Sequence, residues 1–257
     1  MVDSTALTMG CWQETLQSFG FGFSFTTLQR HSGQDGHEML HSLLPGPQIS
    51  RVVPRILKAQ GQRYRDEYLP RVVAFPEVRA LFERVKRTGQ KIAIATSSSA
   101  DELDHYIALT KTGDLVEAVA CGEDVQHDKP NSALINVALL RTGGIKPEHA
   151  VMVGDTPYDA IAARRAGLAA IGMLSGGFSR HDLEASGCVA IYRDPADMLA
   201  RYGESHAGEV YAARRFTLLS AMAVSFLSTA FSSSRFCCSK AAQSLRPNSL
   251  AQATNVP

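Results

Sequence analysis

Asp155 and Asp159 stand one helical turn apart, directly after a run of small apolar residues at 150–153. Such a run is typical of a strand that is covered on both faces, and Gly154 followed by Pro157 predicts a sharp exit into a helix. Asp155 would then lie at the carboxyl end of a parallel strand, where open α/β sheets bind ligands. Two carboxylates at such a point suit a hard cation such as Mg²⁺, although the same residues could simply cap the helix.

Two further groups of polar residues belong to the same pattern. The segment "KIAIAT" at 91–96 reads as a strand that ends in hydroxyls, with Thr96 followed by Ser97, and Lys129 precedes a predicted helix. Taken singly, the hydroxyls could cap a helix and the lysine could be a solvated surface residue. Taken together with Asp155, they supply a hydrogen-bond donor, a fixed positive charge and a metal-holding carboxylate, which a transferring phosphoryl group needs.

Helices and strands alternate from about residue 72 onward. Ser99 and Glu102 give a capping-box pattern at the start of one of these helices. The predicted strands lie at 91–96, 116–121, 150–153, 168–174 and 188–192. This alternation predicts an α/β fold with a doubly wound parallel sheet and right-handed crossovers. Residues 4–70 contain no convincing strand and read as helices, which we interpret as a small helical insert beside the sheet.

Three segments resemble a known family. "IAIATSSS", "GEDVQHDKP" and "VMVGDTPYDAIAARRAGLAAIGMLSGGFS" resemble the second, third and fourth motifs of the haloacid dehalogenase (HAD) superfamily, in its phosphoglycolate-phosphatase-like branch. The likeness covers roughly residues 2–203. It implies a Rossmann-like core with a helical cap, and a Mg²⁺-dependent phosphomonoester hydrolase that acts on a small phosphorylated metabolite through an aspartyl-phosphate.

The resemblance also implies a role for each polar residue. Thr96 and Ser97 would bind the phosphoryl group, and Lys129 would steady both the nucleophile and the phosphate. Asp155 would hold Mg²⁺, with Asp159 next to it at the metal and supporting the acidic turn. In the cap loop, where relatives often carry a basic residue, this chain has "SGQDG" at 32–36, so contact of the cap with the substrate is in question.

The chain departs further from the first motif of the family. Family members begin with an apolar strand that ends in D-x-D-G-T, in which the first Asp is the nucleophile and the second the general acid. Here "MVDSTAL" matches only the tail of that motif, so we expect strand, nucleophile and acid to lie before residue 1 and the chain as given to be inactive. The loss of a central strand would also remove about 6–12 kcal/mol of apolar burial. The alternative is a non-catalytic HAD-like module that binds a phosphorylated ligand or a partner.

The predicted domains are a core at 1–3 and 71–203, a cap at 4–70 and a tail at 204–257. From residue 210 the tail has nine serines, no acidic residue and an apolar run at 216–231. We expect the tail to be disordered or extraneous. Two alternatives stay open: a membrane anchor with acylated Cys237 and Cys238, or an apolar run that docks where the central strand is missing.

Composition excludes several classes of function. All 25 acidic residues precede residue 210, so the body of the chain carries no basic excess that would favour nucleic acid. No G-x-G-x-x-G follows a strand, and a response-regulator receiver would have its acids before its lysine, which is the opposite order. The five cysteines form no C-x-x-C pair, and residues 1–25 lack the pattern of a signal peptide. These features favour a cytoplasmic protein, and membrane association is not expected.

Overall fold

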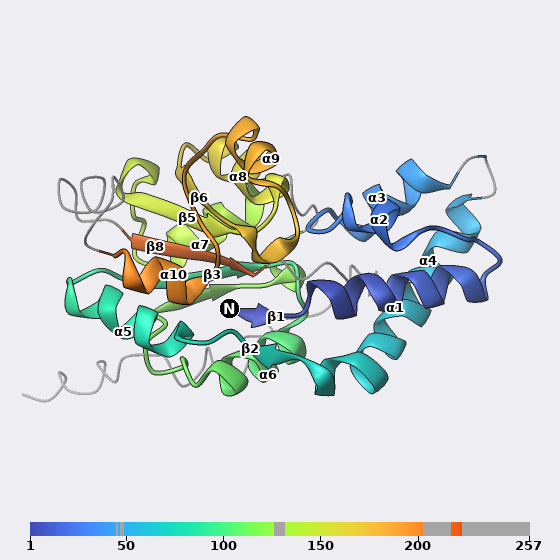
Figure 1. Cartoon of the computed structure of the whole chain (residues 1–257), viewed down its shortest axis with the longest axis horizontal. Coiled ribbons are helices and arrows are strands. Elements are labelled where there is room, and N and C mark those ends of the chain that lie inside the picture. The colour runs from blue at the N-terminus through green and yellow to red at the C-terminus, as the bar shows by residue number, and fades with distance from the viewer. Residues whose placement is uncertain (45, 47–48, 126–131, 203–216, 223–257) are drawn as a thin grey trace, which may run out of the picture.

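The computed structural model describes residues 1–44, 46, 49–125, 132–202 and 217–222. Its centre is a sheet of six strands in which every neighbouring pair is parallel, as the alternation in the sequence predicts (Figure 1). In sheet order the strands are β4 (Ala118–Ala120), β3 (Ile92–Thr96), β8 (Thr217–Met222), β5 (Ala150–Gly154), β6 (Ala169–Met173) and β7 (Cys188–Tyr192).

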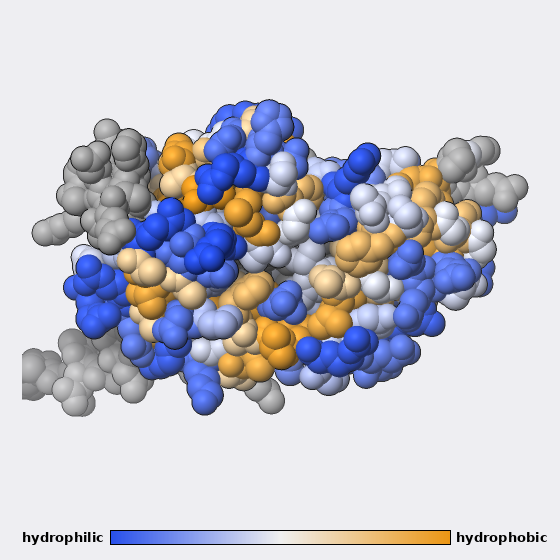
Figure 2. Space-filling model, viewed as in Figure 1, coloured by the Kyte–Doolittle hydropathy of each residue, from blue (hydrophilic) through white to orange (hydrophobic). Residues whose placement is uncertain are grey.

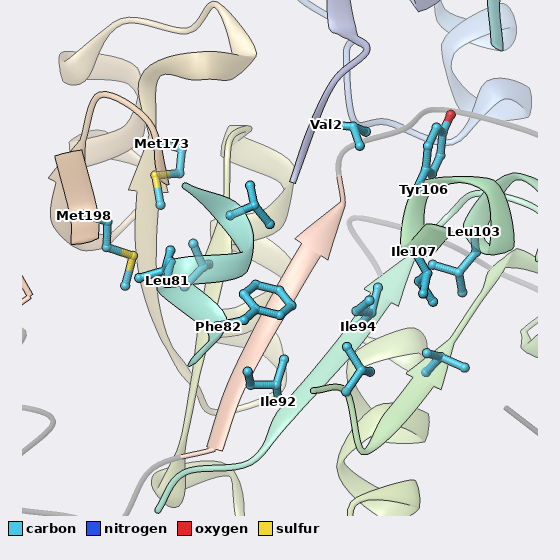
Figure 3. Close-up of a cluster of buried hydrophobic side chains, with 14 of the residues drawn as sticks. Val2, Leu81, Phe82, Ile92, Ile94, Leu103, Tyr106, Ile107, Met173 and Met198 are labelled. Atoms are coloured by element: carbon cyan, nitrogen blue, oxygen red, sulfur yellow. The ribbon is translucent and has the colours of Figure 1, made fainter. Parts of the chain in front are cut away.

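Helices cover both faces of this sheet. One layer contains α5 (Val78–Arg87), α6 (Ala100–Thr110) and α10 (Pro195–Ala200), and the other contains α7 (Ala133–Arg141) and α8 (Pro157–Arg165). Every residue of β3 and β5 is buried, and alternate residues face opposite layers. Figure 3 shows Ile92 and Ile94 of β3 among the larger side chains of the first layer. Alanines dominate the second cluster, which brings α7 and α8 close to the sheet.

The strand at the centre of the sheet comes from the tail. Thr217–Met222 pairs with β3 from Ile92 to Thr96 on one side and with β5 from Ala150 to Val153 on the other. The expectation that the tail stands outside the fold is therefore wrong for these six residues. The alternative, in which the apolar run docks into the gap between the strands, agrees with the structure. The physical reason is that β3 and β5 do not pair with each other, so a strand between them satisfies backbone groups on both.

The N-terminal part of the chain is helical, as predicted, and lies to one side of the sheet (Figure 1). Its helices are α1 (Thr5–Ser18), α2 (Phe25–Gln29), α3 (Gly36–Leu43) and α4 (Ile49–Arg63). They enclose a separate apolar core that is built mainly from Met9, Trp12, Leu16, Leu28, Met39, Leu40 and Ile56. This part therefore buries its own apolar faces and does not depend on the sheet for a core.

Two short connections join the helical part to the sheet. β1 (Val2–Asp3) and β2 (Val73–Ala74) pair in antiparallel fashion, so the chain leaves and returns side by side. Before β2, the chain passes through a π-helical turn at Tyr64–Tyr68 and a 3-10 turn at Leu69–Arg71. The hydroxyl of Tyr64 lies 2.8 Å from that of Tyr106 on α6, and both side chains are buried. This hydrogen bond ties the end of the helical part to the core.

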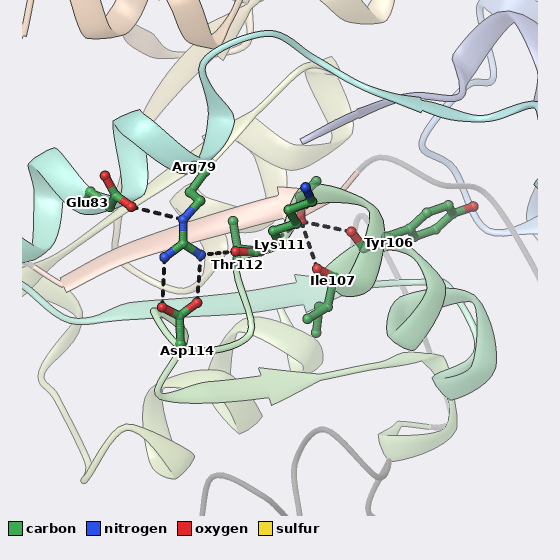
Figure 4. Close-up of polar contacts among 8 residues, drawn as sticks. Arg79, Glu83, Tyr106, Ile107, Lys111, Thr112 and Asp114 are labelled. Carbon is green, nitrogen blue, oxygen red and sulfur yellow. Dashed lines mark hydrogen bonds and ion pairs between the residues drawn. The ribbon is translucent and has the colours of Figure 1, made fainter.

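A polar network fastens α5 at the surface (Figure 4). The guanidinium of Arg79 donates two hydrogen bonds of 2.8 and 2.9 Å to the carboxylate of Asp114, and its Nε lies 2.9 Å from Glu83. It also donates to the backbone carbonyl of Lys111. The guanidinium lowers the pKa of Asp114 through these hydrogen bonds. The network joins α5 to the loop that follows α6.

The remaining elements are short. α9 (Arg180–Ala185) precedes β7, and single 3-10 turns lie at Gly122–Asp124, Pro147–His149 and Leu174–Gly176. Within the described residues, none of the helices has the length and apolar character that crossing a bilayer requires.

Candidate active site

The turn after β5 is held together by the carboxylate of Asp159. Its Oδ2 accepts hydrogen bonds from the backbone N–H of Asp155 at 3.2 Å, from the backbone N–H of Thr156 at 3.1 Å and from the hydroxyl of Thr156 at 2.9 Å. Thr156 in turn caps α8, accepting from the N–H of Asp159 at 3.3 Å. This reciprocal capping box satisfies the first N–H groups of the helix, and both side chains are buried.

Gly154 is required for this arrangement. A Cβ atom at that position would lie 2.4 Å from the Cβ of Asp159, which is closer than two carbon atoms can approach. The last residue of the strand must therefore lack a side chain so that Asp159 can fold back onto the turn. The G-D-T-P-Y-D motif thus has a structural explanation for its Gly and its second Asp.

Asp155 is the more exposed carboxylate of the turn. It lies half-buried, directly after the carboxyl end of β5. The buried amino group of Met1 is close enough to be affected by its charge: burial lowers the pKa of that amino group, and the Asp155 carboxylate opposes the shift. The first residue of the chain and the acidic turn therefore lie next to each other.

The hydroxyls after β3 divide into two groups. Ser99 caps α6, and the N–H of Ser99 donates to Glu102 at 3.2 Å, so the predicted capping box is present. Thr96 lies ahead of this cap, fully buried, and its Oγ1 accepts from the N–H of Ser98 at 3.1 Å. Ser97 is also buried. Helix capping therefore does not account for Thr96 and Ser97.

The two polar strand ends are brought to the same edge of the sheet. Thr96 is in register with Met222 of β8, and on the other side of that strand Val153 is in register with Ser220. Asp155 follows Val153 by two residues, so it lies level with the end of β8. Neighbouring strands are spaced by about 4.8 Å, which separates Thr96 and Asp155 by about 10 Å across the end of β8.

Two parts of the predicted site, the lysine and a cluster of metal ligands, are not seen among the residues that the structure describes. Lys129 lies outside the residues that the structure describes. Within the described ranges, the side chains of His, Cys, Asp and Glu form no group of three or more that could hold a metal ion. The Oδ2 of Asp159 accepts three hydrogen bonds within the turn, and Asp155 is the more exposed of the two carboxylates.

A loop of the helical part lies over the acidic turn. Gly33 has a φ of +86°, and a Cβ there would lie 2.6 Å from the hydroxyl oxygen of Thr156. The hydroxyl of Tyr158 donates to the carbonyl of Arg30 at 3.2 Å, and the side-chain amide of Gln29 donates to the carbonyl of Gly177 at 3.4 Å. These contacts were not identified from the sequence, where the two glycines of "SGQDG" were the only signal of a close approach.

Gln34, which occupies the loop position discussed above, points its amide oxygen at a histidine. Its Oε1 lies 2.8 Å from Nδ1 of His31, within the same loop. The pair fixes the conformation of the loop next to Gly33. This loop position therefore carries a polar, uncharged amide where relatives often have a basic residue.

Comparison with known proteins adds to this geometry. The sequence profile of the haloacid dehalogenase-like hydrolases matches residues 1–173. The chain belongs to this family. A hydrolase from Pseudomonas syringae has a similar structure, with a TM-score of 0.71 and 27% sequence identity, over 79% of this chain and 93% of that one. The family and the α/β core that the sequence motifs implied are thereby confirmed.

Other proteins are similar over a shorter stretch or at lower identity. The pyrophosphatase PpaX of Bacillus velezensis is 30% identical over 102 residues, which are 40% of this chain and 47% of the relative. The chain thus spans about half the length of the curated relatives that it matches. A haloacid dehalogenase-like hydrolase from Streptococcus pneumoniae has a TM-score of 0.66 at 20% identity, over 79% of this chain and 93% of that one, and shares the fold.

Proposed function

We propose that this chain binds a small phosphorylated metabolite where β3 and β5 end, in the manner of a Mg²⁺-dependent phosphomonoester hydrolase, and that as it stands it does not hydrolyse that ligand. The observation that carries the proposal is the central strand. β8 lies between the two polar strand ends, and none of the residues from 217 to 257 is Asp or Glu. By the resemblance to the family, a carboxylate at the end of the central strand would take the phosphoryl group.

The proposed binding roles follow from the chemistry of the side chains. The hydroxyl of Ser97 donates a hydrogen bond to a phosphoryl oxygen, that of Thr96 does so by giving up its 3.1 Å hydrogen bond to the hydroxyl of Ser98, and the ammonium of Lys129 balances part of the phosphate charge. All three hydrogen bonds involve the ionised phosphate, but the one from Lys129 joins two opposite charges, so the lysine contributes most to affinity. All three groups can act on a bound phosphate without a nucleophile.

Asp155 fits a role as the Mg²⁺ ligand. Its carboxylate stands half-buried at the strand end, and Mg²⁺ is usually bound by one or two carboxylates together with phosphate oxygens and water. Asp159 fits the supporting role instead, because its Oδ2 holds the turn. The metal would reduce the negative charge of the phosphate when bound.

A second candidate is an active hydrolase whose nucleophile precedes Met1. The observation in its favour is the position of the Met1 amino group, which is buried and lies close to Asp155. A strand joined upstream of Met1 would arrive directly at this edge of the sheet. It would have to take the place of β8, because β8 occupies the space between β3 and β5.

One set of measurements separates the two candidates. We expect the chain to release no phosphate from p-nitrophenyl phosphate or 2-phosphoglycolate with Mg²⁺, and to bind 2-phosphoglycolate in a calorimetric titration. Lys129→Ala and Thr96→Val should each weaken binding, the lysine variant by about tenfold or more. Lys146→Ala is a matched control for the lysine variant, since this exposed lysine precedes the opposite end of β5.

Two outcomes would contradict the proposal. Mg²⁺-dependent phosphate release that disappears in Asp155→Ala would make the chain a working hydrolase. Absence of binding would exclude the phosphoryl site itself. If an upstream D-x-D-G-T strand is added and phosphate release follows, the second candidate is supported for the extended protein.

A further inference from the structure

A groove of about 650 Å³ lies beside the acidic turn, on the outer side of α8. Its walls come from α8, from α9 with the segment before it, and from the residue after α2 of the helical part. The residues that matter below are Arg30, Pro157, Ile161, Arg164, Phe178 and Asp182. Thr96, Ser97 and Asp155 do not line it, so it is separate from the strand-end site described above.

Two guanidinium groups give the groove its charge. Arg30 and Arg164 are both exposed, and neither forms an ion pair with any of the residues that the structure describes. The one carboxylate in the lining, that of Asp182, accepts hydrogen bonds from the N–H and the hydroxyl of Ser179 at 3.1 and 2.6 Å. The Asp182 carboxylate thus serves as an acceptor in the cap of α9. With two arginines and one aspartate, the groove has a net positive charge. Figure 2 shows hydrophilic residues gathered over α9 next to the helical part.

The rest of the lining is apolar. Phe178, Ile161 and Pro157 are half-buried and present part of their side chains to the groove. An aromatic ring and a branched aliphatic chain offer a surface on which a planar ring can stack. Guanidinium groups bind phosphate oxygens in a bidentate manner, which suits a phosphate attached to such a ring. The volume is within the range of small-molecule sites.

We infer that this groove binds an organic phosphate that carries a planar ring, of the size and chemistry of a nucleotide. The phosphate lies between Arg30 and Arg164, and the ring covers Phe178 and Ile161. Arg30 comes from the helical part and Arg164 from the sheet part, so a ligand that reaches both also joins them. The hydrogen bonds Tyr158 to Arg30 and Gln29 to Gly177 already hold the two walls together beside the groove.

The test is a calorimetric titration of the full chain with ADP, in EDTA so that no divalent metal contributes at Asp155. Binding is expected, and it should weaken at least about tenfold in Arg30→Gln and in Arg164→Gln, the loss typical of a charged hydrogen bond. Arg180→Gln is the matched control, because it removes the same charge from the neighbouring α9 at a position outside the lining. Inorganic pyrophosphate should bind more weakly than ADP and should be insensitive to Phe178→Ala, whereas ADP should lose affinity in that variant.

Three outcomes would overturn the inference. The site would be excluded if ADP does not bind with a dissociation constant of about 1 mM or lower. Binding that survives in both arginine variants would place the ligand elsewhere. Binding that is lost in Thr96→Val but kept in Arg30→Gln and Arg164→Gln would assign ADP to the strand-end site, so a failure here is distinct from a failure of the proposed function.

Discussion

β3 and β5 both lie beside β8 and run in the same direction, but the three strands continue differently. β3 leads through Thr96 and Ser97 into the capping box of α6, and β5 leads through Asp155 into the capping box of α8. β8 ends at Met222, and the sequence that follows has no acidic residue. Backbone pairing needs only an extended segment, whereas a ligand-binding edge needs particular side chains. A segment can therefore complete the backbone pairing of the sheet without supplying the side chains that bind a ligand at its edge.

The largest expected effect concerns the central strand. Leu219→Pro removes a backbone donor from a strand that pairs on both sides, and it should cost more than about 3 kcal/mol and abolish the cooperative unfolding transition. The measurement is urea unfolding followed by circular dichroism. Leu219→Val is the control, because it keeps both the N–H and a high strand propensity.

The same comparison can be made by shortening the chain. A protein that ends at residue 209 should melt at a lower temperature than the full chain or aggregate, because β3 and β5 would lose the strand between them. An unchanged melting temperature would show that β8 is not needed and that the sheet closes in another way.

A smaller effect is expected at the turn after β5. Asp159→Ala removes an acceptor from two N–H groups and one hydroxyl, all at a buried turn, and should destabilise the protein by about 3 kcal/mol. Asp155→Asn should change the free energy of unfolding by less than about 1 kcal/mol, because that side chain is half-buried and asparagine keeps its size. Equal losses in the two variants would show that the two aspartates do not divide support and ligand binding between them.

An effect smaller than the loss in Asp159→Ala is a pH dependence at the capping box after β3. Burial raises the pKa of Glu102 to about 7, and its hydrogen bonds to Ser99 and the charge of Arg65 only partly oppose this. Because the folded pKa lies above the unfolded value of 4.5, the folded state binds the proton more tightly. Glu102 therefore contributes stability below pH 4.5, and this contribution is lost as the pH rises to about 7.

The corresponding experiment compares the wild type with Glu102→Gln, which keeps the capping geometry without a charge. Between pH 5 and pH 7 the wild type should lose about 2 kcal/mol more than the variant, measured as the free energy of unfolding in urea. Parallel pH profiles for the two proteins would mean that Glu102 titrates as an exposed carboxyl.

The parts of the fold that could be predicted have local signals. The strand that ends at Thr96, the strand that ends at Gly154 and the box of Ser99 with Glu102 are each encoded within a few neighbouring residues. From the resemblance to the family, these elements could then be predicted to lie along one edge of the sheet. Lys129 stays a prediction, since it lies outside the described residues.

The parts that could not be predicted depend on contacts between distant residues. The apolar run at 216–231 carries no mark of which strands it will pair with, so its docking in place of the missing central strand was one open alternative, and its serine-rich surroundings favoured a segment outside the fold. The approach of Gly33 to Thr156 and the groove between Arg30 and Arg164 likewise join separate segments. Periodicity and spacing report on neighbours in the chain, so these features required the structure.

The position of β8 has a consequence for the synthesis of the protein. Among the strands that the structure describes, β8 is translated last, long after its neighbour β3 has been synthesised. At usual rates of translation, the open edge of β3 waits for roughly 6–25 s and that of β5 for roughly 3–13 s before their common neighbour is available. During that interval each half-sheet offers an unpaired edge to other chains. The yield of folded protein in a cell should therefore depend on chaperones that cover nascent chains.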